Sequence, residues 1–368
     1  MNVLITGAAG FVGRNLSAAL RRKKDISLLE FDLANTGEEL QRFLATANII
    51  FHLAGVNRPH DIKEYESGNT GFTSEICKML QDLKRTPKIV FSSSIQAEKN
   101  NPYGNSKRRA EEVLHAYAKS TGAECVIYRF KNLFGKWCQP NYNSVTATYC
   151  YNIARDLPIQ ISDPTHELEL TYIDDVVEAF FNELSSQKSG FRFADPLMSY
   201  RVTLKDLAET IRLFRASRSS LHLPDFSKPF IRAIYATYVS YLEKQDFSYS
   251  LDIKSDQRGG LAEFIKAAGF GQIFISRTYP GIVRGNHYHQ TKAEKFFVLE
   301  GDALIRFRHI LENEVIEYRI SGGEYRVVDI PPGYTHSIEN VGKNELITLF
   351  WSDEMFDPNR PDTYYEQV

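Results

Sequence analysis

The sequence predicts an α/β fold in which a doubly wound parallel sheet is followed by a smaller all-β barrel. Up to about residue 245, short apolar runs alternate with stretches of helical period, the pattern of strands covered by helices on both faces. Beyond that point, β-rich runs are broken by Gly, Pro and Asn, as in sandwiches and barrels. These patterns predict an N-terminal domain over 1–245 and a C-terminal domain over 246–368.

Four continuous apolar runs predict the parallel strands of the first domain, because strands buried on both faces carry few polar residues. They are NVLIT (2–6), NIIFHLA (48–54), KIVFSSS (88–94) and ECVIYRF (124–130). Apolar residues at helical spacing between them predict helices, most clearly in NLSAALRRKK (15–24) and SKRRAEEVLHAYAKS (106–120).

Composition excludes several classes of partner. The chain has 368 residues and 43% hydrophobic content, enough for two domains with buried cores. Its formal net charge of −2 gives no field that attracts nucleic acid or a membrane surface, so a small molecule is the expected partner. The four cysteines form no CxxC pair, and the chain shows no leader pattern and no apolar run of bilayer length. We therefore expect reduced thiols and a cytoplasmic location.

A glycine-rich turn follows the first predicted strand. Gly7, Gly10 and Gly13 let the backbone approach a pyrophosphate, which the N-terminus of the next helix stabilises. Asp32 follows Gly13 by 19 residues, where an acidic side chain accepts hydrogen bonds from ribose hydroxyls. This context favours a dinucleotide site over an ordinary turn. Asp32 has an alternative interpretation as the first residue of the next loop.

Tyr103 and Lys107 lie four residues apart, on one face of a helix. A free tyrosine has a pKa of about 10, and a nearby lysine cation is expected to lower it enough for proton exchange with a carbonyl oxygen. The serines at 92–94 end the preceding strand, where a hydroxyl can polarise the same carbonyl. The alternative is a surface tyrosine and lysine on an amphipathic helix.

These motifs together resemble the extended short-chain dehydrogenase/reductase superfamily, whose members handle nucleotide-sugars on a Rossmann-type sheet. The matching stretches are GxxGxxG at 7–13, HLAG at 52–55, SSS at 92–94 and YxxxK at 103–107. The resemblance implies Ser94, Tyr103 and Lys107 as catalytic residues. It also implies an NAD(P)H site to which Tyr103 and Lys107 contribute. The other residues of that site are Gly7, Gly10, Phe11, Val12, Gly13, Asp32, Leu53, Ala54 and Gly55.

A second cluster of polar residues lies in the C-terminal domain. His287 and His289 share a strand face, Glu294 follows a short turn, and His336 is expected on a facing strand. Three imidazoles and a carboxylate suit zinc, or else manganese, iron or nickel. The spacing resembles the two-part motif of the cupin superfamily, which implies a metal-binding barrel. The alternative is a surface strand with solvated histidines.

The combination of both domains resembles the bifunctional capsular-polysaccharide enzymes that form UDP-2-acetamido-2,6-dideoxy-L-talose, on the route to N-acetyl-L-fucosamine. The stretches that carry this resemblance include HLAGVNRP (52–59), NLFGKWCQPNYNSV (132–145), GNHYHQTKAEKF (285–296) and DIPPGYTHSIEN (329–340). It implies that the cupin inverts the carbon beside the 4-keto group of a UDP-linked 6-deoxy amino sugar, and that the first domain then reduces the ketone. It also implies a homodimer.

Three details are expected from individual residues. Asp32 repels a 2′-phosphate, so NADH should serve at least as well as NADPH. Polar residues after the strand ends are candidates for binding the UDP-sugar, or else serve turns: Asn57, Arg58, Asn132, Asn141 and Asn143. The base for epimerisation stays open among Tyr288, Lys292, Lys295 and Arg306.

Two other functions are compatible with the same motifs. A nucleotide-sugar sensor would only bind its ligand, although such a protein needs no proton relay. A reductase with a purely structural cupin would use four protein ligands to close the coordination sphere of the metal, as structural zinc sites do.

Overall fold

The computed structural model describes residues 1–186 and 188–368, which form two compact units. The first unit comprises Met1–Ile211 with Arg232–Glu243, and the second comprises Arg212–Ile231 with Lys244–Val368. The sequence assigned 212–231 to the N-terminal domain, whereas this segment clusters with the second unit. Backbone hydrogen bonds explain the difference, because Leu223 N donates to Lys266 O and Lys266 N donates to Leu221 O.

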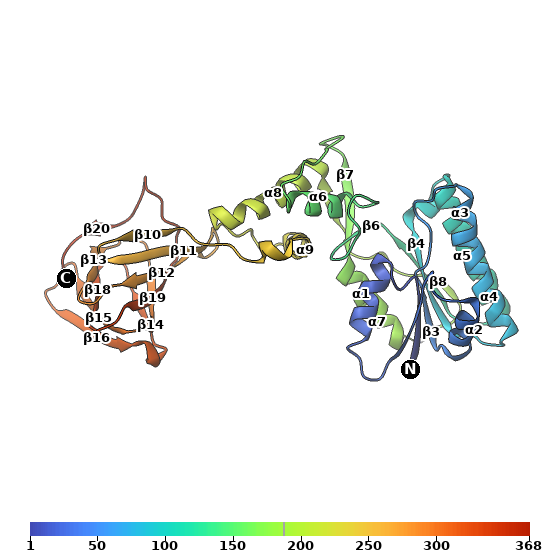
Figure 1. Ribbon diagram of the computed structural model, residues 1–368, viewed down its shortest axis with the longest axis horizontal. Helices are drawn as coiled ribbons and strands as arrows, with labels where there is room; N and C mark the ends of the chain where they lie inside the picture. The colour runs from blue at the N-terminus through green and yellow to red at the C-terminus, as the bar shows by residue number, and fades with distance from the viewer. Residues whose placement is uncertain (187) are drawn as a thin grey trace. The chain divides into compact units, whose positions relative to one another are not determined.

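A six-stranded parallel sheet forms the centre of the first unit, in the order β2-β1-β3-β4-β5-β8. All four strands predicted in this part of the chain are present. Figure 1 shows α1 and α7 on one face of the sheet and α2, α4 and α5 on the other. The strands are β1 (Asn2–Thr6), β2 (Ser27–Phe31), β3 (Ile49–His52), β4 (Lys88–Ser94), β5 (Cys125–Phe130) and β8 (Phe191–Phe193).

The helices α1 (Phe11–Leu20) and α5 (Pro102–Thr121) begin earlier than the apolar period alone predicted. Gly10 is the N-cap of α1, and Asn101 Oδ1 caps α5 by accepting from Gly104 N at 2.8 Å. The other helices are α2 (Gly37–Thr46), α3 (Lys63–Tyr65), α4 (Phe72–Asp82), α6 (Val145–Ile153), α7 (Ile173–Ser185), α8 (Leu204–Ser220) and α9 (Pro229–Val239).

Shorter elements complete the first unit. A π-helical turn, η1 (Glu66–Gly71), precedes α4, and a 3-10 turn, η2 (Ile95–Glu98), follows β4. A three-stranded sheet has the order β6-β7-β9, with β6 (Asn132–Phe134), β7 (Glu167–Tyr172) and β9 (Tyr200–Thr203).

The second unit contains two antiparallel sheets, which confirms the predicted all-β cupin fold. Their orders are β10-β11-β12-β19-β14-β17 and β16-β15-β18-β13-β20. Phe296, Ile305 and Ile338 belong to a buried apolar cluster contributed by both sheets. The strands are β10 (Ile253–Asp256), β11 (Gly259–Ala267), β12 (Gly271–Thr278), β13 (Val283–Tyr288), β14 (Glu294–Glu300), β15 (Asp302–His309), β16 (Val315–Ser321), β17 (Val327–Ile330), β18 (Tyr334–Asn340), β19 (Leu346–Ser352) and β20 (Tyr364–Tyr365). The turns η3 (Lys244–Phe247) and η4 (Gly322–Glu324) complete it.

The four cysteines, Cys77, Cys125, Cys138 and Cys150, are free thiols, as expected. Among the described residues, no helix combines the length and the apolar composition that a membrane span requires.

A buried ion pair holds α5 against the parallel sheet. Glu111 is 3% exposed; its Oε1 accepts from Ser93 Oγ at 2.5 Å, and its carboxylate takes two hydrogen bonds from Arg129 at 2.9 and 2.5 Å. Arg129 also donates to Glu98 at 2.9 Å, but the Glu98 side chain is 69% exposed. One arginine therefore pairs with a buried carboxylate and a solvated one.

The two carboxylates should contribute very differently to stability. We expect Glu111→Ala to lower the free energy of unfolding by about 3–5 kcal/mol, because it leaves a partly buried guanidinium without its main partner. Glu98→Ala should cost roughly 0.5 kcal/mol or less. Urea unfolding of both variants measures the difference, and equal losses would contradict this assignment.

Candidate functional site

The glycine-rich turn between β1 and α1 is shaped by close backbone contacts. Gly7 has φ +72°, and a Cβ there would lie 2.7 Å from Ala54 N. At Gly13 a Cβ would lie 2.1 Å from Gly7 O. The predicted cofactor residues Leu53 and Ala54 therefore lie directly against the glycine-rich turn. Gly10 has no side-chain cap, so the first N–H groups of α1 are not covered by a capping side chain.

Asp32 lies at the same turn, directly after β2. Its Oδ2 accepts from Ala9 N at 2.7 Å, and its Oδ1 accepts from Leu33 N at 2.8 Å. Asp32 therefore begins the next loop, which was the alternative interpretation. Its carboxylate also contacts the glycine-rich turn, beside which the ribose of a dinucleotide is expected. It lines a cavity of about 570 Å³ together with Ala8, Ala9, Arg14, Ser17, Ala18, Arg21, Glu30, Asn35 and Trp137. The two arginines there had not been predicted, and Arg21 is paired with Glu30 at 2.6 Å.

The structure brings the three predicted catalytic residues together. Ser94 ends β4, and its side chain interacts with the Tyr103 phenol in the first turn of α5. Lys107 follows one turn later and is 5% exposed; its Nζ donates to Ser92 O at 3.0 Å and lies 4.9 Å from the centre of the Phe91 ring. The arrangement rules out a solvated surface pair.

The predicted direction of the Tyr103 pKa shift is wrong. Burial raises this pKa, the hydrogen bond from Ser94 only partly offsets that rise, and the Tyr65 ring lies 5.6 Å away. The Lys107 ammonium is directed at Ser92 O and the Phe91 ring. At neutral pH Tyr103 is therefore a protonated phenol, the form that donates a proton to a ketone oxygen. Burial lowers the pKa of Lys107 to about 8, opposed by Glu111.

Asn69 is a site residue that sequence reasoning missed. It is 2% exposed and lies on the π-helical turn η1. Its Oδ1 accepts from Val56 N, and its Nδ2 donates to Val56 O and to Ser106 Oγ, each at 2.9 Å. A Cβ at Gly55 would lie 2.7 Å from Asn69 Oδ1 and 2.9 Å from Lys107 Nζ. Asn69 thus fixes the loop that follows β3 against α5.

The predicted substrate residues converge only in part. Arg58 Nη1 donates to Tyr142 O, which joins the loop of Asn57 to the loop that contains Asn141 and Asn143. Asn141 has φ +54°, and its N donates to Thr148 Oγ1 at 2.9 Å, so this asparagine also serves a turn. Asn132 begins β6 and pairs with Leu170 of β7. All five predicted residues are exposed.

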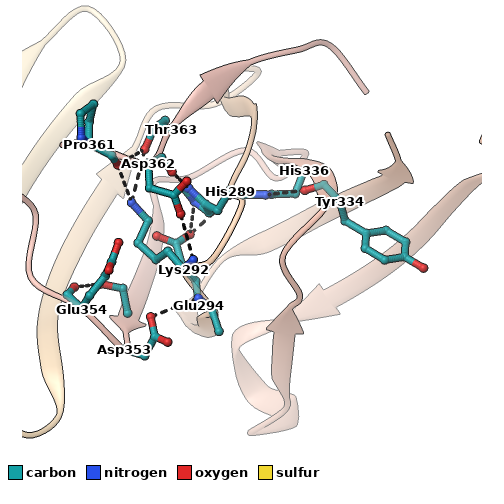
Figure 2. A network of polar contacts seen from close by, with 12 residues as sticks. His289, Lys292, Glu294, Tyr334, His336, Asp353, Glu354, Pro361, Asp362 and Thr363 are labelled. Atoms are coloured by element: carbon teal, nitrogen blue, oxygen red, sulfur yellow. Dashed lines mark hydrogen bonds and ion pairs between the residues drawn. The ribbon is translucent and has the colours of Figure 1, made fainter. Parts of the chain in front are cut away.

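In the second unit, the four predicted metal ligands form one cluster. Each of His287, His289, Glu294 and His336 offers one ligand atom, and these atoms all lie within 4.8 Å of one another. Glu294 Oε2 lies 3.5 Å from His289 Nε2 and 3.6 Å from His336 Nε2. Figure 2 shows three of these side chains, those of His289, Glu294 and His336. The cluster excludes the alternative of solvated surface histidines, because all except His287 are at least nine-tenths buried.

The strand that supplies His336 differs from the prediction. His336 on β18 is the direct partner of His287 on the neighbouring strand β13 of the same sheet. The residue from the facing sheet is Glu294, at the start of β14. Spacing along the chain indicates which residues meet but not which strands are neighbours, because β13 and β18 are far apart in sequence.

The chemistry of the cluster fits a divalent metal ion. Within the described parts of the chain, His289 Nε2 and His336 Nε2 are buried without a hydrogen-bond partner, which is rare for polar atoms. Burial lowers the pKa of His287, and lowers that of His336 to about 3, so both rings are neutral. Burial alone raises the pKa of Glu294, but the nearby histidines and Lys292 lower it overall, so it is ionised. Neutral imidazoles with an ionised carboxylate are the states that bind zinc.

The structure separates the four candidate bases. Lys295 alternates with the inward-facing Glu294 along β14 and pairs with Asp329. Arg306 pairs with Glu317 and Glu339, and Tyr288 stacks on Tyr364 with ring centres 5.3 Å apart. Lys292 is different. It is 7% exposed, and its charge acts on both His287 and Glu294.

Comparison with known families divides the chain in the same two parts. The NAD dependent epimerase/dehydratase family matches residues 3–192, and the polysaccharide biosynthesis C-terminal domain matches residues 254–364. The first match alone covers more than half of the chain.

Individual relatives extend over the full length. A UDP-2-acetamido-2,6-beta-L-arabino-hexul-4-ose reductase of Pseudomonas aeruginosa is 41% identical over 99% of this chain and 98% of its own. The crystal structure of the capsular polysaccharide assembling protein CapF from Staphylococcus aureus is 45% identical, covers 100% of both chains and has a TM-score of 0.93. The UDP-glucuronic acid 4-epimerase from Bacillus cereus, solved with NAD, shares the fold at 18% identity and TM-score 0.56, over 67% of this chain and 100% of its own.

The Pseudomonas aeruginosa relative matches this chain across both domains, so the same pair of domains occurs in that protein. The chain belongs to the NAD dependent epimerase/dehydratase family, in the group whose members carry a polysaccharide biosynthesis C-terminal domain.

Proposed function

We propose that the chain is a nucleotide-sugar reductase of capsular polysaccharide synthesis that acts on a UDP-linked 4-keto-6-deoxy amino sugar. Its product would be UDP-2-acetamido-2,6-dideoxy-L-talose, on the route to N-acetyl-L-fucosamine. The observation that carries the proposal is that Ser94, Tyr103 and the buried Lys107 lie together at the end of a parallel sheet with a glycine-rich turn. The named activity of the Pseudomonas aeruginosa relative supports the ketone as substrate.

The first unit supplies the groups that complete a reduction. The protonated phenol of Tyr103 gives its proton to the ketone oxygen as that oxygen gains negative charge, and the Ser94 hydroxyl stabilises the same oxygen. Lys107 keeps a positive charge beside the site and, by the family resemblance, holds the ribose of the cofactor. The glycine-rich turn, Asp32 and the loop at 53–55 would hold NADH or NADPH, which supplies the hydride when bound.

The second unit would perform the epimerisation. His287, His289, Glu294 and His336 would hold a divalent metal ion, zinc being the best match, which supplies positive charge for an enolate oxygen. A base would then remove the proton from the carbon beside the ketone, and a second proton donor, a side chain or water, would protonate that carbon from the opposite face. Of the four candidates, Lys292 is the one that acts on the cluster, and it would remove that proton in its neutral amine form. We also propose that the chain forms a homodimer, as its family resemblance implies.

Replacing the phenol tests the reductase. Tyr103→Phe should lower kcat for ketone reduction by about 10²–10⁴-fold, because it removes the proton donor. NADH should still quench the protein fluorescence with its ordinary affinity, since the glycine-rich turn is intact. The readout is loss of NADH absorbance after addition of the 4-keto sugar. Undiminished turnover would contradict the assignment, and absence of any turnover in the unaltered chain would favour a sensor.

The same variant isolates the epimerase. In deuterium oxide, Tyr103→Phe should place deuterium at the carbon beside the ketone without reducing the sugar, because proton removal does not need the first unit. Adding His336→Ala should abolish this exchange, while His309→Ala, a histidine outside the cluster, should not. Exchange is followed by proton NMR. Exchange that persists without His336 would mean that the cupin is structural.

Asp32 should set the cofactor preference. We expect kcat/KM with NADH to equal or exceed that with NADPH, because the Asp32 carboxylate repels a 2′-phosphate and the nearby Arg21 is already paired with Glu30. Asp32→Asn should shift the ratio toward NADPH by about tenfold, which corresponds to a lost repulsion of about 1.4 kcal/mol. A strong preference of the unaltered chain for NADPH would refute this.

A further inference from the structure

The last residues of the chain lie against the metal cluster. The strand β20 pairs with β13 so that Tyr365 is opposite His287 and Tyr364 is opposite Tyr288. Figure 2 shows Pro361, Asp362 and Thr363 directly beside His289 and Lys292. None of these three residues belongs to the predicted ligand set or to the candidate bases.

The backbone carbonyl of Asp362 orients one ligand. It lies 2.5 Å from His289 Nδ1, and His289 is 2% exposed. A carbonyl oxygen can only accept, so Nδ1 carries the proton, and the lone pair is left on Nε2, the atom that faces Glu294. Metal-bound histidines commonly donate their second N–H in this way, which fixes both tautomer and ring angle.

The side chain of Asp362 holds the loop between two ligands. Its Oδ1 accepts from Gln290 N at 3.0 Å, and its Oδ2 accepts from Thr291 N and Lys292 N, both at 2.9 Å. Thr291 Oγ1 donates to the same Oδ2 at 3.1 Å. These residues connect His289 to Glu294, so one carboxylate determines the path of the chain between the two.

Lys292 provides a second attachment to the same segment. Its Nζ donates to Pro361 O at 3.1 Å and to Thr363 Oγ1 at 3.3 Å. Asp362 itself has φ +40°, a backbone conformation uncommon outside glycine. Contacts on both sides of the residue hold this conformation in place.

We propose that Asp362 is a positioning residue of the metal centre, acting through His289 and the 290–292 loop. Its carbonyl sets the ring of His289, and its carboxylate sets the distance between His289 and Glu294. The inference rests on the metal centre proposed above. It adds that the ligand geometry depends on a segment more than 70 residues further along the chain.

The test compares matched variants of the full, metal-stripped chain with Co²⁺ as the probe. Asp362→Ala should bind Co²⁺ about 10–100-fold more weakly in competition with a chelator, the range seen when an outer-shell partner is lost. Asp362→Asn should lie between this variant and the unaltered chain. Asp357→Asn, in the same segment, removes a carboxylate that accepts only from the nearby Asn359 N among the contacts seen, and should leave affinity unchanged.

The visible spectrum of bound Co²⁺ separates positioning from general stability, because its bands report ligand geometry. We expect altered bands in Asp362→Ala and unaltered bands in Asp357→Asn. Binding by Asp362→Ala within about twofold of the unaltered chain, with the same spectrum, would overturn the proposal. If Asp362→Ala does not fold, as judged by circular dichroism, Asp362→Asn decides by the same criteria. Failure of the unaltered chain to bind Co²⁺ would overturn the metal centre itself, and with it this inference.

Discussion

Polar groups removed from water need partners, and this constraint shapes both sites of the molecule. In the first unit the buried ammonium of Lys107 is held by Ser92 O, and the polar groups around it are hydrogen-bonded in turn. In the second unit the Nε2 atoms of His289 and His336 both face Glu294 Oε2, at 3.5 and 3.6 Å, distances longer than a good hydrogen bond. In the first site, protein groups supply the hydrogen-bond partners of these buried polar groups. In the second site, two buried imidazole nitrogens have no such partner among the described residues, which fits a site for a cation.

The proposed function would require a definite order of events at the two sites. A hydrogen beside a carbonyl is acidic only while the carbonyl exists, so epimerisation has to precede reduction. Epimerisation alone is reversible, and reduction of the ketone draws it forward. A protonated Tyr103 suits the second step, because the phenol must give up a proton and not take one. Burial, which raises the pKa of Tyr103, therefore favours the direction of ketone reduction.

Much of this arrangement could be predicted from local sequence. Strands buried on both faces read as continuous apolar runs, and Gly7 and Gly13 stand where no Cβ fits. The four residues of the predicted metal site were identified from their spacing and from its resemblance to the cupin motif, and the structure does bring them together. The sign of the Tyr103 shift could not be predicted in this way, because it depends on how deeply the fold buries the phenol.

Other features depend on contacts between distant parts of the chain. The pairing of His287 with His336 follows from which strands become neighbours, and a one-dimensional pattern does not record that. Asn69 holds the loop at Val56 from a π-helical turn, and no residue type in the sequence predicts such a turn. Asp362 is 73 residues from His289, so their contact does not follow from local sequence. Asn69 and Asp362 hold predicted site residues in place through contacts that the spacing of the motifs does not show.

Metal analysis of the purified full-length chain tests the central claim most directly. If buried imidazoles and a carboxylate need a cation, the chain should carry close to one divalent transition-metal ion per molecule, and His336→Ala should carry almost none while keeping its fold. A chain that holds no such ion, even after incubation with zinc, would contradict the account.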